Sequence, residues 1–323
     1  MKSSNAATRS ASGADVDGTH KPRPSPGSRF SCAARYRLRI DDSIVPKIQR
    51  YHTLKKKSPT ELALRILEKK EYNLLEKKIL RNAPLLHRLL SDKLPPKLQD
   101  TLRGAFVQAF SAVFSHGNAV IDKTFSAEKL KKTYDIHRYT AELEPTRKHL
   151  RAFAKESGKI TRGNTALSGA VGGTMGLFGI GLPDIPVFVG FLLKNVYETA
   201  IANGFGYQTP GEQYFILLLI ESALSSGDAA AERETMVNAW IEAHRKIPAA
   251  TQRQLVFDDQ MRRTAHALAD AVLYMKFIQG IPIIGAAGGI SDAVCVSQIG
   301  TYAAYKYERR RLMTPKNESE DHL

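Results

Sequence analysis

The sequence predicts an all-α fold, a multi-helix bundle with two Gly/Pro-rich apolar helical segments. Complete capping boxes occur at Ser58-Pro59-Thr60-Glu61 and at Thr209-Pro210-Gly211-Glu212, each with a capping hydroxyl, a proline at the first helical position and a glutamate at the third. Residues 98–114 repeat a large apolar side chain every four positions, which places them on one helix face. No segment alternates with period two for long, so strands are not expected.

Length and composition allow a large helical core and exclude cysteine-based scaffolds. The 323 residues are 43% hydrophobic and 24% charged, which is typical of a globular protein. Two cysteines, Cys32 and Cys295, are too few for a disulfide framework or a cysteine-based zinc site. Residues 1–28 contain no apolar run that could act as a cleavable signal peptide.

The net charge of +15 is concentrated in the first half of the chain. Residues 1–60 carry 13 basic and 4 acidic side chains, and residues 61–160 carry 20 and 12. Residues 161–313 are balanced, with 13 of each sign. Such an excess favours an anionic partner, either nucleic acid or lipid headgroups, although a solvated lysine-rich helical surface would give the same count.

These changes in composition divide the chain into three parts. Residues 1–57, which begin with a Ser-, Ala-, Gly- and Pro-rich stretch, are expected to form a flexible basic tail. Residues 58–313 are expected to form one helical domain, with a basic half over 58–160 and an apolar, Gly-rich half over 161–313. Residues 314–323 are expected to form a disordered tail.

Caps and apolar spacing predict the individual helices. The box at Ser58 opens a helix with leucines inward and many Glu and Lys side chains outward. Ser126 is expected to cap a short helix, and residues 135–157 are expected to form one polar, basic helix. The box at Thr209 opens a helix that contains the apolar run FILLLI, and Asp228 is expected to cap the next one.

Two Gly/Pro-rich segments, residues 165–193 and 277–300, carry one charge each, Asp184 and Asp292. Each reaches the length of a membrane span only if its aspartate is included, which costs about 2.5–3.5 kcal/mol near a helix centre. A peripheral or re-entrant hairpin therefore fits better than two spans. A helical hairpin buried in the core of the protein, with Asp184 as a cap, is an alternative that the sequence leaves open.

Small and helix-breaking residues in these segments favour close contact with a membrane or a partner helix. Glycines four residues apart let two helix backbones approach each other closely, and the prolines break each segment into shorter helices. The residues expected to make such contacts are Gly172, Gly176, Pro183, Pro186, Gly285 and Gly289.

Basic residues flank both segments. Lys155, Lys159 and Arg162 precede the first segment, and a run of tyrosines and cations follows the second. Tyrosines with Lys or Arg at the end of an apolar run are typical of a membrane interface, although cations at a helix C-terminus also favour the helix dipole. The residues expected to contact anionic lipid are Lys306, Arg309, Arg310 and Arg311.

Motifs of known catalytic sites are missing from the sequence. It contains no P-loop, no dinucleotide-binding fingerprint, no Gly-x-Ser-x-Gly elbow and no His-Glu-x-x-His, and neither a cofactor nor a metal is expected. Asp184, Glu221 and Asp292 lie in apolar surroundings and could meet in one acidic site, which would suit a soluble hydrolase. Residues 126–138 are basic but lack a recognition-helix frame, so no nucleic-acid partner is expected.

Several spaced motifs resemble those of the EcsC family over about residues 60–313. They are Leu182-Pro183-Asp184-Ile185-Pro186, Ala202-Asn203-Gly204-Phe205-Gly206-Tyr207, the run from Ile281 to Gly289, and Tyr307-Glu308-Arg309-Arg310-Arg311-Leu312. Gln208 and Asp292 depart from the family pattern, which has Asp and Asn there. The resemblance implies a helical, mostly bacterial protein that assists membrane or export physiology, because the family is named after a protein encoded beside an ABC transporter. It brings no established reaction.

The sequence thus favours a non-enzymatic, membrane-associated accessory protein on the cytoplasmic side of the membrane, or in the cytoplasm. Anionic lipids are the expected partners, and ABC transporter subunits are further candidates. The soluble hydrolase is the alternative.

Overall fold

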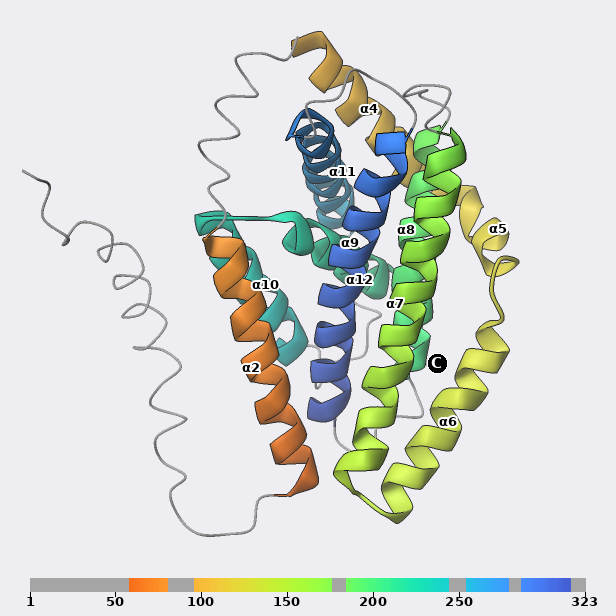
Figure 1. Cartoon of the computed structure of the whole chain (residues 1–323), viewed down its shortest axis with the longest axis vertical. Coiled ribbons are helices and arrows are strands. Elements are labelled where there is room, and N and C mark those ends of the chain that lie inside the picture. Colours follow the sequence, from red (N-terminus) through yellow and green to blue (C-terminus); the bar gives the residue numbers. More distant parts are fainter. Residues whose placement is uncertain (1–57, 81–95, 176–183, 244–253, 279–285, 315–323) are drawn as a thin grey trace, which may run out of the picture. The chain divides into compact units, whose positions relative to one another are not determined.

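Helices with buried apolar faces make up the architecture (Figure 1). The computed structural model describes residues 58–80, 96–175, 184–243, 254–278 and 286–314. This part of the chain contains ten α-helices, one π-helical turn (η1) and no strand, which confirms the all-α prediction. The elements are α2 (Pro59–Ile79), α4 (Pro96–Ala112), η1 (Val113–Gly117), α5 (Asn118–Asp122), α6 (Ala127–Leu143), α7 (Arg147–Met175), α8 (Asp184–Ala202), α9 (Pro210–Leu224), α10 (Asp228–Ala243), α11 (Gln254–Ile278) and α12 (Ala286–Met313).

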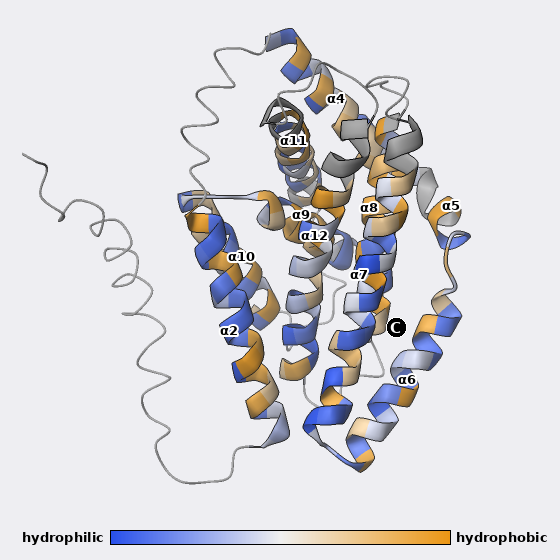
Figure 2. Ribbon diagram, viewed as in Figure 1, coloured by the Kyte–Doolittle hydropathy of each residue, from blue (hydrophilic) through white to orange (hydrophobic). Residues whose placement is uncertain are grey.

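The two most apolar helices, α8 and α9, lie inside the bundle. In α9, no side chain from Phe215 to Ile220 is more than 1% exposed. In α8, Val189, Leu192 and Val196 are fully buried. Figure 2 shows mostly hydrophobic residues along α8, whereas hydrophilic residues are spread over the outer helices α2, α6 and α7. Burial of these two helices supplies much of the hydrophobic stabilisation of the fold.

One helix in the described part of the chain is long and apolar enough to cross a membrane. It is the stretch of α8 from Ile185 to Ala202, and 72% of it is buried inside the bundle. A core helix of a globular protein can have the same length and composition. Burial of this stretch of α8 against neighbouring helices is consistent with such a core helix.

The predicted helix starts form, with one difference. Ser58 Oγ accepts the backbone N–H of Glu61 at 3.1 Å, and the Glu61 carboxylate accepts the N–H of Ser58 at 3.1 Å, so this capping box is complete. Thr209 likewise accepts the N–H of Glu212 at 3.3 Å. The Glu212 carboxylate instead turns inward to Arg310, so only half of the second predicted box forms.

The prediction of a single helix over residues 135–157 is wrong, because the helical conformation is interrupted at residues 144–146. Glu144 has extended backbone angles, with φ −136° and ψ 90°, and ends α6. The proline at position 145 disfavours the helical conformation at the residue before it. The break separates α6 from α7, which then continues without interruption past residue 160 to Met175. The change from basic to apolar composition therefore falls within one helix.

Helices α7 and α12 lie side by side and run in opposite directions (Figure 1). Their close approach depends on Gly300, where an added Cβ would lie 2.3 Å from Asn195 Nδ2 and 2.8 Å from Thr161 Cγ2. Asn195, on α8, also donates to the backbone carbonyl of Val296 at 3.2 Å. Gly300 thus lets three helices meet at one buried polar contact.

Substitution of Gly300 by alanine is expected to destabilise the protein. The new methyl group must displace Asn195 and Thr161, and overpacking of this kind costs about 1–3 kcal/mol. Gly163→Ala in α7 is the matched control, since a Cβ there meets no atom within 4 Å and removes a helix-weakening glycine. Denaturant unfolding should show a gain of about 0.5–1 kcal/mol for the control. Equal stability of the two variants would contradict this packing.

Candidate functional site

Two of the four cations expected to contact anionic lipid, Lys306 and Arg310, are buried in the bundle. Lys306 is fully buried, Arg310 is 7% exposed, and Arg309 is bonded to Glu71. Burial and pairing keep Lys306 and Arg310 from external lipid headgroups, whereas the Arg309 side chain is 18% exposed. Arg311 lines a pocket instead. Of these four cations, it alone has no carboxylate partner in the described part of the chain.

Lys306 joins α12 to α2 and α10. Its ammonium lies 3.0 Å from the Glu71 carboxylate and donates to Glu234 and, at 3.0 Å, to Asn238 Oδ1. Tyr302 OH donates to Glu234 at 2.7 Å. Burial by itself would raise the pKa of Glu234, but the charge and hydrogen bond of Lys306 outweigh burial and lower it.

Arg310 joins α12 to α9 in an aromatic enclosure. Its Nη1 donates to both carboxylate oxygens of Glu212, at 2.8 and 2.7 Å, and Tyr307 OH donates to the same carboxylate at 2.8 Å. The guanidinium centre lies 4.1 Å from the ring centroid of Phe205 and 4.9 Å from that of Trp240. Charge-assisted hydrogen bonds and cation–π contacts together offset the cost of burying this cation.

Of the three carboxylates in the proposed acidic site, only the side chain of Glu221 is described, so its assembly stays a prediction. Glu221 is 6% exposed and lies 2.8 Å from Arg233 Nε, and Gln260 donates to it at 2.7 Å, so it has a structural role between α9, α10 and α11. Asp184 is the first residue of α8 and Asp292 lies near the start of α12, but their side chains are outside the described part. Among the described residues, no three His, Cys, Asp or Glu side chains could hold a metal ion.

Three helix ends within the Gly/Pro-rich segments lie at the same end of the bundle. The C-terminus of α7 and the N-termini of α8 and α12 lie at this end (Figure 1). Pro186, in the first turn of α8, is exposed. Gly172 and Gly289 lie within α7 and α12, whereas Gly176, Pro183 and Gly285 are outside the described residues.

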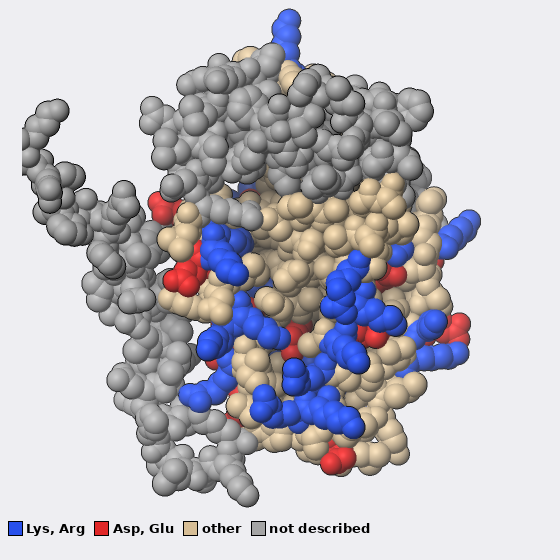
Figure 3. Space-filling model, viewed as in Figure 1, with Lys and Arg blue, Asp and Glu red and all other residues tan. Residues whose placement is uncertain are grey.

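A basic face covers α2 and α7. Six exposed cations of α7 recur at spacings that place them within about 120° of its circumference, given 100° per residue. Figure 3 shows Lys and Arg side chains gathered over α2, α7 and α12 on one face, with few acidic side chains between them. The six cations, which we name the α7 stripe, are Arg147, Lys148, Arg151, Lys155, Lys159 and Arg162.

A groove of about 400 Å³ runs between α2 and α7, with α12 as its floor. Lys70 and Arg162 line it from the two sides, and Thr161, Thr301 and Glu308 are among its other lining residues. Glu308 is 8% exposed, and no hydrogen bond or ion pair fixes its carboxylate within the described part of the chain. Burial raises the pKa of Glu308, despite the opposing charges of Arg311 and Lys70.

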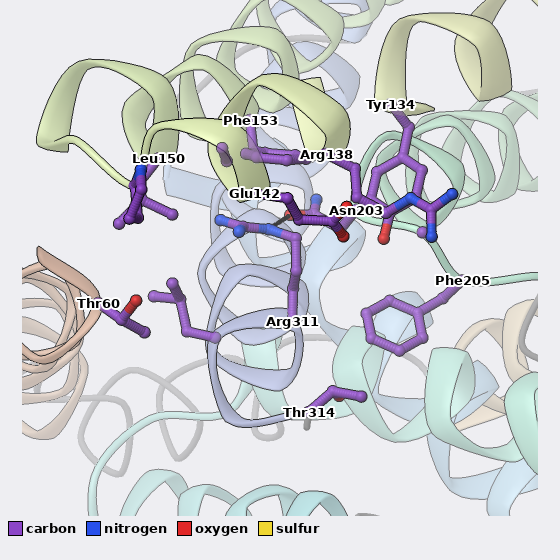
Figure 4. A pocket seen from close by; sticks show the side chains of 14 residues that line it. Thr60, Tyr134, Arg138, Glu142, Leu150, Phe153, Asn203, Phe205, Arg311 and Thr314 are labelled. Atoms are coloured by element: carbon purple, nitrogen blue, oxygen red, sulfur yellow. Dashed lines mark hydrogen bonds between the residues drawn. The ribbon is translucent and has the colours of Figure 1, made fainter. Parts of the chain in front are cut away.

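Arg311 lies in a second pocket of about 140 Å³, between α6, α7, α12 and the turn after α8. Figure 4 shows its side chain crossing the pocket beneath Phe153, with Arg138 and Tyr134 on one side. The guanidinium centre is 3.9 Å from the Phe153 ring centroid, and its Nε donates to Asn203 Oδ1 at a long 3.4 Å. Burial lowers the pKa of Arg311 to about 10.

Sequence reasoning found some of these residues but assigned them other roles. Tyr134 and Arg138 fell in the basic segment considered for nucleic acid, and Arg311 fell in the expected lipid contact. The four-residue spacing of Tyr302, Lys306 and Arg310 places them on one face of α12, and the structure shows that this face is buried. Their glutamate partners come from distant helices, and no spacing in the sequence pairs them.

Removing the negative charge of Glu234 and that of Glu308 is expected to have opposite effects on the free energy of unfolding. Glu234→Gln is expected to lower the free energy of unfolding at pH 7 by about 2 kcal/mol, because it removes charged hydrogen bonds from Lys306 and Tyr302. Glu308→Gln is expected to raise it, because the raised pKa means that ionisation of this buried carboxyl opposes folding.

Urea unfolding as a function of pH checks the sign of both effects. The stabilisation by Glu234 is present above its unfolded pKa of about 4.5 and is lost as the pH falls through its lower folded value. The gain from Glu308→Gln should vanish below about pH 4.5, where the wild-type carboxyl is protonated in both states. A loss of stability in Glu308→Gln at pH 7 would show that the carboxylate has a partner.

Comparisons with known proteins agree with the resemblance seen in the sequence. Residues 61–312 match the EcsC protein family. Protein EcsC of Bacillus subtilis (strain 168) is 26% identical over 148 residues, which cover 46% of this chain and 57% of that protein. No solved structure matches the chain. Because the family match includes α2, α12 and the helices between them, the chain belongs to the EcsC family.

Proposed function

We propose that this chain is a non-enzymatic accessory protein that binds the anionic, cytoplasmic surface of a membrane through the basic face of α2 and α7. Membership of the EcsC family links it to the physiology of the ABC transporter system after which the family is named. The α7 stripe is the observation that carries the proposal.

The stripe has the charge and the exposure that a headgroup layer requires. Its six cations are exposed, and among the described residues their one ion pair joins Lys159 to Glu156 at 3.7 Å, with the lysine side chain 75% exposed. An exposed pair of this kind contributes little to stability, so the charge is available to an external anion. Each such cation near an anionic leaflet contributes about 1 kcal/mol, and the contribution falls with added salt.

The cations of α2 extend the same face. Arg65, Lys69 and Lys70 are exposed, and Lys70 lines the groove opposite Arg162 of α7. The two helices thus present cations on both sides of the groove. A surface several charges wide suits a sheet of phosphates better than a single acidic side chain.

Apolar side chains near the Gly-rich segments support a second contact with the membrane. Leu167 of α7, Val187 of α8 and Val294 of α12 are 44, 40 and 39% exposed. Each belongs to a Gly/Pro-rich segment and lies within about three turns of the end of its helix. Shallow burial of apolar groups adds to electrostatic attraction when a protein lies on a bilayer.

Vesicle sedimentation tests the proposal. The full-length protein should sediment with phosphatidylglycerol-containing vesicles and be partly released by high salt. Substituting Arg151, Lys155, Lys159 and Arg162 by glutamine should weaken binding at least tenfold, because up to about 4 kcal/mol is lost. The matched control removes four exposed lysines outside the stripe, namely Lys123, Lys129, Lys131 and Lys132.

The control separates a local surface from the overall charge of the protein. Both variants lose four positive charges, so a general attraction would weaken both equally. Recovery of the wild-type protein in the supernatant with and without anionic vesicles would rule out the proposal. Equal weakening of the two variants would rule out the α7 stripe as the contact surface.

A further inference from the structure

We propose that the Arg311 pocket binds a small organic anion, with one oxyanion group, carboxylate or phosphate, held by Arg311 and a short apolar body held by the surrounding hydrophobic side chains. This site is separate from the basic face and does not depend on the proposed membrane function.

The need for an anion follows from the guanidinium of Arg311, which is unpaired among the described residues. Its Nη2 is buried and makes no hydrogen bond, and the described residues place no carboxylate within ion-pair distance of the guanidinium. The other cations in this part of α12, Lys306, Arg309 and Arg310, each have a glutamate partner. A buried guanidinium without a counter-charge is costly, and a bound oxyanion would supply the missing acceptor.

Tyr134 supplies a second donor. The residue is 5% exposed, lines the same pocket, and its hydroxyl makes no hydrogen bond within the described part of the chain. Its ring lies directly over Gly204, where an added Cβ would lie 2.4 Å from the hydroxyl oxygen. Gly204 has φ +87°, a conformation that favours glycine. The turn after α8 is thus shaped to admit the Tyr134 ring.

The charges around the pocket favour a ligand with a single negative charge. Arg138 also lines it, but Asp135 lies 3.9 Å from this arginine. Glu142 lies at the exposed rim, and the carboxylate of Glu308 acts on Arg311 from the neighbouring groove. These acids offset part of the positive charge, so a monoanion is better matched than a dianion.

The rest of the lining sets the size and character of the ligand. Leu150, Phe153, Phe205 and Leu312 give the pocket apolar walls. Its volume of about 140 Å³ is close to that of an engineered apolar cavity that holds benzene. An oxyanion carrying a body of about this size fills both parts of the pocket, and a longer chain could extend through the open side.

Titration calorimetry with hexanoate, hexanol and inorganic phosphate tests the proposal on the full-length protein. Hexanoate should bind more tightly than either the uncharged alcohol or phosphate alone. Arg311→Met should weaken hexanoate binding about tenfold or more, because it removes the cation while keeping a side chain that packs on Phe153. Arg262→Met, at an exposed arginine of α11, is the matched control and should leave the affinity unchanged.

Tyr134→Phe keeps the test decisive if Arg311→Met does not fold. It removes only the hydroxyl and should weaken hexanoate binding about two- to fivefold. Unchanged hexanoate affinity in the folded Arg311 variant, or in Tyr134→Phe if only that variant folds, would overturn the proposal. So would hexanol binding as tightly as hexanoate.

Vesicles identify the source of the oxyanion. Loss of binding to phosphatidylglycerol vesicles in Arg311→Met, by the same factor as for hexanoate, would support a lipid headgroup as the ligand. Unchanged vesicle binding together with weakened hexanoate binding would support a soluble anion.

Discussion

The pairing of buried cations on α12 with glutamates from other helices is the constraint on which the structure depends. Lys306 and Arg310 leave water when the bundle forms, so each requires a fixed carboxylate, and Arg309, which is partly buried, is also paired with one. Glu71 of α2, Glu212 of α9 and Glu234 of α10 provide these carboxylates. Because a buried ion pair tolerates little displacement, these contacts set the positions of three helices around α12. Breaking one would leave an uncompensated charge in the core.

This pairing distinguishes two groups of cations, one buried in ion pairs and one exposed to solvent. Lys306, Arg309 and Arg310 of α12 form ion pairs that hold the bundle together, and their acidic partners neutralise their charge. The exposed cations of α2 and α7 face outward and have few such partners, and Figure 3 shows Lys and Arg side chains gathered on this face. Arg311 belongs to neither group, because it is partly buried but has no carboxylate partner in the part of the chain that the structure describes. The pocket proposed to bind an anion and the basic face therefore follow from the same arrangement of charges.

Local features of the fold could be predicted from the sequence because they depend on neighbouring residues. The capping box at Ser58, the cap at Ser126 and the apolar helix after Thr209 are all present. The break before Pro145 was also readable from the proline, although the prediction ran the helix through it. The start of a helix needs only three or four residues to specify it.

Lys155, Lys159 and Arg162 of the α7 stripe were visible in the sequence, but the buried ion pairs of α12 could not be predicted because they join residues far apart in the chain. Lys306 lies 235 positions after Glu71 and 72 after Glu234, and the spacing in either segment does not reveal the other. Tyrosines and cations after an apolar run are consistent with a membrane interface and with a buried network of ion pairs. Tertiary packing decides between them, and here it buries Tyr302, Lys306 and Arg310.

Lysine footprinting tests the separation of inner and outer cations most directly. An amine-reactive reagent and peptide mass spectrometry report the modification rate of each lysine in the native, full-length protein. The account predicts that Lys306 stays unmodified with or without anionic vesicles, while Lys155 and Lys159 react quickly and become protected when vesicles are added. Rapid modification of Lys306 that vesicles suppress, with no change at Lys155 and Lys159, would contradict it.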